Sequence, residues 1–320
     1  MAGTIEGGGA SSSSVLIVLR VPHAARWSSR DIGATHVAVL VAAFTDTNAS
    51  TLAPYPLTPS SVDPTRPAAL ATPTDASLLE ALASASKHGM AATIWPVLDL
   101  NWAHGLGDTP TPVMRNNHTR DTRSDIGWNF TDAEWLVWWP GYQRFVLRYA
   151  NVARHASKRH SNATATTTTT RGVFSLGSEL SHAFKAPALR DRWCALAGDV
   201  RKLLPDCAVT IASRPEEAAG LAPLWGCLDA IGINARWPLK PTDDDHTVRG
   251  LTAAWQPIKA GVARLATAHS KQVIFTAVAY QSRNRTYESP RGKFRFALCS
   301  VYLVLAFILI VLGLRARFDI

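Results

Sequence analysis

The sequence predicts an α/β fold, a TIM (β/α)8-like barrel, and three observations predict it. Short β-branched or apolar runs alternate with helical patterns, which indicates parallel βαβ units. Polar residues follow several of these runs, as they do where buried strands end at the mouth of a barrel. The 320 residues also suffice for one barrel of about 250 residues with extra segments at both ends.

Seven runs are typical of buried strands, one fewer than a closed eight-stranded barrel requires. They are VLIVLR (15–20), THVAVLVA (35–42), ATIWPVL (92–98), GVFSLG (172–177), AVTIA (208–212), LDAIGI (228–233) and VIFTAVAY (273–280). Where an eighth strand and helix should follow residue 290, the chain continues into an apolar segment instead. We therefore expect an incomplete barrel with an open seam between its first and seventh strands.

Start signals mark the helices between these strands. Thr74 is placed to cap a helix with one apolar face, and Thr131 to Glu134 form a capping box. Pro140 then suits the first turn of a second helix, where its missing N–H costs no hydrogen bond. The apolar stripe of that second helix is predicted to face the core and consists of Tyr142, Phe145, Val146, Tyr149 and Val152.

Both ends of the chain depart from the barrel pattern. The Gly/Ser-rich start, residues 1–14, is expected to be disordered, and the barrel is expected to span residues 15–290. Residues 296–314, FALCSVYLVLAFILIVLGL, are uncharged and mostly apolar. As a helix they reach about 28 Å, which matches a bilayer core. We expect a single-pass transmembrane helix there, followed by a short basic tail at 315–320.

Charge and motifs exclude some partners and leave the compartment open. No zinc-finger spacing, RNP-like run or basic repeat accompanies the net charge of +9, so no nucleic-acid partner is expected. The four cysteines lack CxxC spacing, so no metal site is expected. The N-terminal segment has no basic region and only a short apolar run, so it lacks the features of a signal peptide. This favours the cytosol. The sequons N-x-[ST] instead favour a glycoprotein of the secretory pathway or cell surface with a lumenal or extracellular barrel; they lie at Asn48, Asn117, Asn129, Asn162 and Asn284.

Candidate site residues lie at the carboxyl ends of the expected strands, because barrel active sites are built there. Asp99 ends the third strand, Asn234 ends the sixth, and Thr276 and Tyr280 belong to the seventh. Glu179 directly follows the buried fourth strand, beyond a glycine that clears space. Glu179 is therefore the first candidate for a catalytic carboxyl group.

The order of several motifs resembles glycoside hydrolase family 113, the retaining endo-β-1,4-mannanase-like barrels of clan A. The similarity covers roughly residues 31–290. The motifs are RSDIGW (123–128), WLVWWPGYQRF (135–145), YANVA (149–153), FSLGSEL (174–180), LDAIGI (228–233), WPL (237–239) and IFTAVAYQS (274–282). The resemblance implies a glycan partner that is β-linked, a polysaccharide or oligosaccharide, and it implies no cofactor.

The resemblance also implies a pair of glutamates, of which this chain keeps one. Retaining glycosidases hold two carboxyl groups about 5–5.5 Å apart, one as nucleophile and one as acid/base. Glu179 matches the acid/base position, whereas the nucleophile position falls on Ala277. Because a methyl group can neither attack the sugar nor activate water, we expect a catalytically impaired, glycan-binding pseudoenzyme.

Further site residues follow from the same comparison. Arg123 matches an arginine that lines the family's cleft, and Trp237 and Tyr280 are expected to stack on sugar faces beside Asp99 and Asn234. The chain departs from the family where Ser213 and Arg214 replace an asparagine after strand five, and where Asn234-Ala235-Arg236 replaces an Asp-Ala-Tyr-like end of strand six.

Two alternatives stay open. One is an active glycoside hydrolase in which Glu179 works with another carboxylate, such as Asp99 or Glu288. The other is a truncated or mis-spliced product, in which an unrelated apolar tail replaces strand eight and the barrel does not fold stably.

Overall fold

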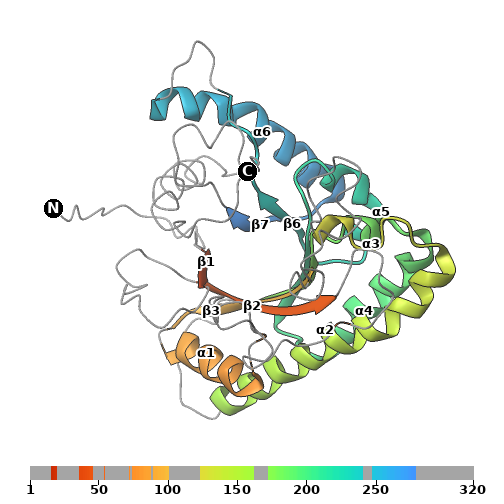
Figure 1. Cartoon of the computed structure of the whole chain (residues 1–320). Helices are drawn as coiled ribbons and strands as arrows, with labels where there is room; N and C mark the ends of the chain where they lie inside the picture. The colour runs from red at the N-terminus through yellow and green to blue at the C-terminus, as the bar shows by residue number, and fades with distance from the viewer. Residues whose placement is uncertain are drawn as a thin grey trace, which may run out of the picture.

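The computed structural model describes residues 16–19, 36–45, 54, 72, 74–87, 89–100, 123–161, 172–240 and 247–278. In this part of the chain, parallel strands curve around a common interior and the helices lie on their outer side (Figure 1). The strands are β1 (Leu16–Leu19), β2 (His36–Thr45), β3 (Ala91–Leu100), β4 (Gly172–Ser178), β5 (Cys207–Ala212), β6 (Ile231–Ala235) and β7 (Val273–Val278). The α/β class and the seven expected strands are thereby confirmed.

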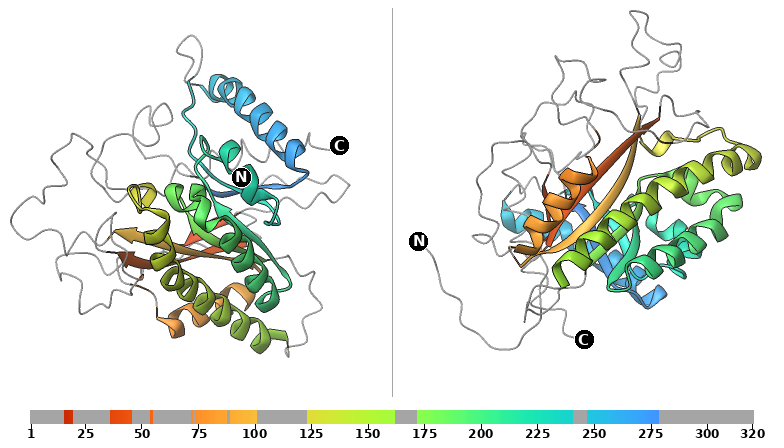
Figure 2. Two further views of the ribbon diagram at one scale, coloured as in Figure 1. Left: turned by 90° about the vertical axis from the view of Figure 1, so that its right-hand side faces the viewer. Right: turned by 90° about the horizontal axis from the view of Figure 1, so that it is seen from below.

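In the described residues, four longer helices and several short ones connect the strands. The α-helices are α1 (Asp75–Lys87), α2 (Asp132–Ser161), α3 (Ser181–Lys185), α4 (Arg190–Leu203), α5 (Ala222–Trp225) and α6 (Val248–His269). The 3-10 helices are η5 (Arg123–Asp125), η6 (Pro187–Leu189) and η7 (Ala218–Leu221). Helices α2 and α4 run side by side along the outside of the sheet (Figure 2). The helical layer thus covers the outer face of the strands, as a βαβ chain requires.

The strands pair in the order in which they occur along the chain. β1 to β5 form one parallel sheet, and β6 pairs with β7 in parallel. The two sheets are joined where the N–H of Ser213 donates to the carbonyl of Gly232 (3.0 Å) and the N–H of Asn234 donates to the carbonyl of Ser213 (2.8 Å). Gly232 permits this approach, because a Cβ there would lie 2.0 Å from the carbonyl oxygen of Ile211. The junction brings the ends of β5 and β6 together.

The first and last strands approach each other without pairing. Cα atoms of β1 and β7 come within 8 Å of each other, yet the two strands belong to different sheets and no ladder joins them in the residues described. Paired strands lie about 4.7–4.9 Å apart. Among the described residues no strand pairs with both β1 and β7, and the expected open seam stays a prediction. The region beyond residue 278, where strand eight would follow, lies outside the described residues, so its absence stays a prediction.

The helix start signals are confirmed. The N–H of Ser77 donates to Oγ1 of Thr74 (3.1 Å), which caps α1. At α2, Thr131 N–H donates to Oε2 of Glu134 (2.8 Å) while Glu134 N–H donates to Oγ1 of Thr131 (3.3 Å). This reciprocal pair is the capping box that the sequence predicts.

The prediction that a second helix begins at Pro140 is wrong, because α2 continues through this residue. A proline inside a helix cannot bond the carbonyl four residues earlier, here that of Leu136. Both Pro140 and Leu136 are exposed, so water satisfies that carbonyl. The stripe expected to face the core is buried, at Tyr142, Phe145, Val146, Tyr149 and Val152.

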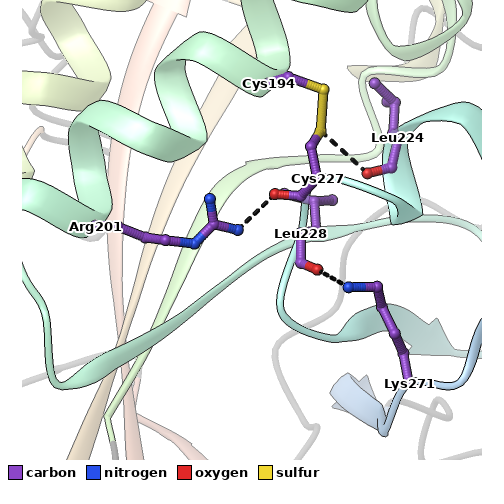
Figure 3. Close-up of a disulfide and its surroundings, with 6 residues drawn as sticks. All are labelled: Cys194, Arg201, Leu224, Cys227, Leu228 and Lys271. Atoms are coloured by element: carbon purple, nitrogen blue, oxygen red, sulfur yellow. Dashed lines mark hydrogen bonds between the residues drawn. A yellow bond between two sulfur atoms is a disulfide. The ribbon is translucent and has the colours of Figure 1, made fainter.

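A disulfide fastens two elements of the outer layer. Cys194 in α4 and Cys227 after α5 are joined, with their Cα atoms 5.4 Å apart (Figure 3). On either side of this link, Arg201 donates to the carbonyl of Cys227 and Lys271 donates to that of Leu228. Closing a loop of 33 residues removes about 4 kcal/mol of conformational entropy from the unfolded chain, in the chain-entropy account of disulfides.

Several expected segments lie outside the described residues. These are the N-terminal segment 1–14, the transmembrane segment 296–314 and the basic tail 315–320. Within the described part, no helix has the length and apolar character needed to cross a membrane. The described residues of the barrel fall between 16 and 278, inside the expected range of 15–290.

The core beneath the end of β4 leaves no room for a side chain at position 177. A Cβ on Gly177 would lie 2.5 Å from the hydroxyl oxygen of Tyr142. That hydroxyl donates to the carbonyl of Leu176 (2.8 Å), and the Tyr142 ring stacks on Trp138 at 4.6 Å and contacts Trp193 edge-on at 5.5 Å. Because these aromatic residues are fully buried, the tyrosine cannot move aside.

We predict that Gly177→Ala lowers the free energy of unfolding by about 1–3 kcal/mol through this overlap. Tyr142→Phe alone is expected to cost about 1 kcal/mol, the contribution of one hydrogen bond. In the Tyr142→Phe background the alanine should cost clearly less, because the hydroxyl that it meets is gone. Urea unfolding of the four proteins measures the coupling. Strictly additive effects would contradict this account of Gly177.

Candidate functional site

Glu179 stands at the end of β4 in an unusual backbone conformation. Its φ is +54°, in the left-handed region that residues with a side chain seldom adopt. The N–H of Glu179 donates to the carbonyl of Ala212 at the end of β5 (2.8 Å), which holds the backbone in place. Such a conformation costs about 1–3 kcal/mol, and residues that keep it cluster at functional sites. The backbone thus directs one carboxyl group toward the ends of the neighbouring strands.

A chain of buried polar side chains links three strand ends. Oγ1 of Thr276 on β7 donates to Oδ1 of Asn234 on β6 (2.8 Å), and Nδ2 of Asn234 donates to Oε1 of Glu179 (2.6 Å). All three residues are buried. Each donor therefore has an acceptor, and Asn234 is fixed in the one orientation that serves both neighbours.

Three arginines surround the same carboxyl group. Nη1 of Arg236, just beyond β6, lies 3.5 Å from Oε1 of Glu179. Nε of Arg214, just beyond β5, lies 3.9 Å from Oε2 of Glu179. Arg123 in η5 adds its charge to the same site and forms two hydrogen bonds with Asp99, at 2.8 and 3.0 Å.

These neighbours keep Glu179 ionised. Burial raises the pKa of the Glu179 carboxyl, because a charged group loses solvation away from water. The charges of the three arginines and the hydrogen bond from Asn234 outweigh burial, and they hold the pKa below the ordinary value of 4.5. A glycosidase acid needs the opposite shift, because it must carry a proton near neutral pH. Glu179 is therefore built here as a carboxylate.

Ala277 lies directly beside this polar chain. Its register partner across the β6–β7 ladder is Asn234. The residue is 6% exposed and belongs to a small apolar cluster with Trp95, Val97 and Ala212. The position thus adjoins Glu179 through Asn234, but it brings only a methyl group to the site.

The other predicted site residues divide into two groups. The structure brings Arg123, Asp99 and Asn234 to Glu179. Trp237 is half-buried and packs edge-on against Trp255 at 5.4 Å and Phe275 at 5.7 Å, which gives its ring a part in the core. Tyr280 and the alternative carboxylate Glu288 lie outside the described residues.

Arg214 and Arg236 are site residues that the sequence analysis noted only as departures from a family pattern. Arg236 directly follows the buried strand β6, and Arg214 follows the buried strand β5 after one intervening residue, Ser213. This is the same signal that selected Glu179. Applied to basic as well as acidic residues, the rule that barrel sites form at strand ends would have found them.

The low pKa of Glu179 predicts how stability depends on pH. A group whose pKa is lower in the folded than in the unfolded state stabilises the fold above its unfolded pKa, and the stabilisation is lost as pH falls through the folded pKa. Glu179→Gln should therefore be less stable near neutral pH, by about 1–3 kcal/mol, because the arginines lose their counter-charge. As the pH is lowered, the unfolding free energy of Glu179→Gln should also decrease less steeply than that of the unmodified protein.

Urea unfolding between about pH 3 and about pH 7 checks this prediction, with the exposed Glu80→Gln in α1 as control for removing a carboxylate. Equal acid slopes for the unmodified protein and Glu179→Gln would show that Glu179 is not held ionised by its neighbours.

Two solved structures share the fold of this chain. One is the GH113 β-mannanase AaManA from Alicyclobacillus acidocaldarius, at 17% identity and a TM-score of 0.57 over 84% of this chain and 70% of that one. Another is a GH113 β-1,4-mannanase, at 18% identity and a TM-score of 0.60 over 90% and 75%. No protein-family model and no curated protein matches the chain. At these identities the likeness shows the fold alone: the chain has the TIM-barrel fold of the glycoside hydrolases related to mannanases, and membership of family 113 stays a prediction.

Proposed function

We propose that the chain is a glycoside-hydrolase-like barrel that binds a β-linked glycan at Glu179 and has lost retaining hydrolysis. The observation that carries this proposal is the place of Ala277, which pairs across the β6–β7 ladder with Asn234, the residue that donates to Glu179 at the end of β4. A retaining site needs a second carboxyl group about 5–5.5 Å from the first. In the described residues, Glu179 is the only acidic side chain in the buried core.

A retaining reaction needs a nucleophile and a proton donor, and the site lacks both. A methyl group at position 277 provides no nucleophile, and an ionised Glu179 provides no proton for the leaving oxygen. Each lost function costs orders of magnitude in rate, at 1.36 kcal/mol per tenfold. Binding does not need either function, because a carboxylate and an amide still accept and donate hydrogen bonds to sugar hydroxyls.

The alternative of an active hydrolase would require another carboxylate. Among the described residues, Asp99 is the candidate, because Arg123 interacts with both Asp99 and Glu179. Two hydrogen bonds from Arg123 engage both oxygens of Asp99. Such a bidentate pair engages both oxygens that would have to attack the sugar or activate water. The structure thus favours the binding role over this alternative.

We predict that the unmodified chain does not hydrolyse β-1,4-manno-oligosaccharides. Ala277→Glu should raise the rate above that of Ala277→Gln, which has the same size but no charge. The gain should appear on the acid side of neutrality, since Glu179 must take up a proton to act as an acid. Chromatography of the sugar products measures cleavage. Clear hydrolysis by the unmodified chain that Glu179→Gln abolishes would establish the active alternative instead.

We also propose that the barrel folds in the secretory pathway. Two observations support this location: the disulfide between Cys194 and Cys227, and the exposure of Asn129 in its sequon. Disulfides persist in oxidising compartments, and an exposed sequon asparagine is accessible on the surface. The other four sequons lie outside the described residues.

Treatment of the full chain from eukaryotic cells with an endoglycosidase should therefore increase its electrophoretic mobility. Asn129→Gln should remove one step of that change, because it removes the attachment site. Thr131→Ser is the matched control, since it keeps both the sequon and the hydroxyl that caps α2. An unchanged mobility together with reduced Cys194 and Cys227 in rapidly alkylated cells would place the chain in the cytosol.

A further inference from the structure

Residues 123–128 form a tight turn at the mouth of the barrel, before α2 begins. Arg123 binds both oxygens of Asp99 at the end of β3, at 2.8 and 3.0 Å. The next residue, Ser124, accepts a hydrogen bond from Arg214, which follows β5. The helix η5 at the start of the turn also packs against β3 and α3. The turn therefore borders the site that the strand ends form.

Contacts within and beneath this turn fix its backbone. Ile126 is fully buried, and Gly127 has a φ of +72°, in the region that favours glycine. A Cβ on Gly127 would lie 2.3 Å from the buried indole of Trp135, so the backbone passes directly over this ring. The N–H of Trp128 donates to the carbonyl of Asp125 (3.0 Å). The backbone that carries Trp128 is thus held in place before any ligand binds.

The side chain of Trp128 faces solvent from this fixed backbone. It is 57% exposed, whereas every other tryptophan in the described residues is buried or half-buried. Tryptophan is highly buried on average, because burial of its large ring stabilises the fold. A rigidly held aromatic ring loses little conformational entropy when it meets a ligand. Trp128 is therefore suited to a ligand that has an apolar face.

A sugar ring has such a face. One side of a β-linked hexose presents C–H groups, which pack on an aromatic ring and remove apolar surface from water. The sequence analysis expected Trp237 to stack on sugars, but its ring packs against Trp255 and Phe275. Trp128 instead combines an exposed ring with a place only five residues after Arg123.

We propose that Trp128 forms a second sugar-binding position, on which a β-linked glycan stacks where it extends past Arg123 from the Glu179 site. This inference rests on the proposed function and adds a preference for long glycan chains to it. Glu179 and Asn234 bind one sugar through hydrogen bonds, and Trp128 binds another through apolar contact. Affinity should therefore rise with chain length.

Calorimetric titration of the full chain with β-1,4-mannobiose and β-1,4-mannohexaose tests the proposal. Trp128→Ala should weaken binding of mannohexaose about tenfold and leave binding of mannobiose unchanged, because the disaccharide occupies the Glu179 site alone. Val137→Ala is the control, since Val137 is an exposed apolar residue on α2. Equal effects of Trp128→Ala on both sugars would overturn the inference and leave the proposed function standing. Binding of neither sugar by the unmodified chain would overturn both.

Tryptophan fluorescence gives a second measurement on the same proteins. Mannohexaose should shield the exposed ring of Trp128 from quenching by acrylamide. Trp128→Phe should remove this protection but keep most of the affinity, because phenylalanine still offers an aromatic face. Circular dichroism confirms folding of each variant. Protection that persists in full in Trp128→Phe would assign the sugar to another tryptophan and reject the proposal.

The neighbouring sequon offers a second source of sugar rings, the protein's own glycan on Asn129. In protein from eukaryotic cells without added sugar, Asn129→Gln should leave the quenching of Trp128 unchanged. Stronger quenching in this variant would show that the protein's own glycan covers the ring, and it would overturn the proposal.

Discussion

The negative charge of Glu179 is the constraint on which the site depends. A carboxylate with a side chain only 10% exposed needs compensation, and it receives it from Arg236, Arg214, Arg123 and Asn234. These neighbours come from the ends of different strands or from the short helix η5, so they meet only when the strands stand in register. Removing the charge of Glu179 would take away an interaction with each of the three arginines. The ion cluster and the fold at the barrel mouth therefore stabilise each other.

Packing behind the site fixes where that charge lies. Tyr142 in α2 donates to the carbonyl of Leu176, and its hydroxyl occupies the space beside Gly177. The aromatic residues around Tyr142 are fully buried, so they set the distance between α2 and the end of β4. Two residues after Gly177, the backbone of Glu179 adopts the left-handed conformation. The aromatic core beneath β4 thus positions the backbone from which Glu179 extends.

Local signals predicted the strands and helix starts because their causes are local. The β-branched runs became strands, and the hydroxyls of Thr74 and Thr131 cap the helices they precede. The helix start predicted at Pro140 was wrong because the cost of a proline inside a helix depends on the carbonyl that loses its partner, here that of Leu136. The cost is small where that carbonyl is exposed to water, and this exposure is a property of the folded surface. Similarly, nothing local shows that Arg214 and Arg236 converge on a residue more than thirty positions earlier. Glu179 and Asn234 could be predicted individually, but the low pKa of Glu179 arises from the assembly.

Ala277, Arg214 and Arg236 together determine the charge of the proposed glycan site. Retaining hydrolysis needs a protonated carboxyl beside an ionised one, and close carboxylates raise each other's pKa. Burial raises the pKa of Glu179, but the charges of the three arginines and the hydrogen bond from Asn234 outweigh burial and lower it. A carboxylate at position 277 would supply a nucleophile and would also raise the pKa of Glu179, which favours uptake of a proton by Glu179 on the acid side of neutrality. In the proposed function, the methyl group of Ala277 and the arginines at the ends of β5 and β6 therefore act in the same direction, because the first provides no nucleophile and the second lower the pKa of the expected acid.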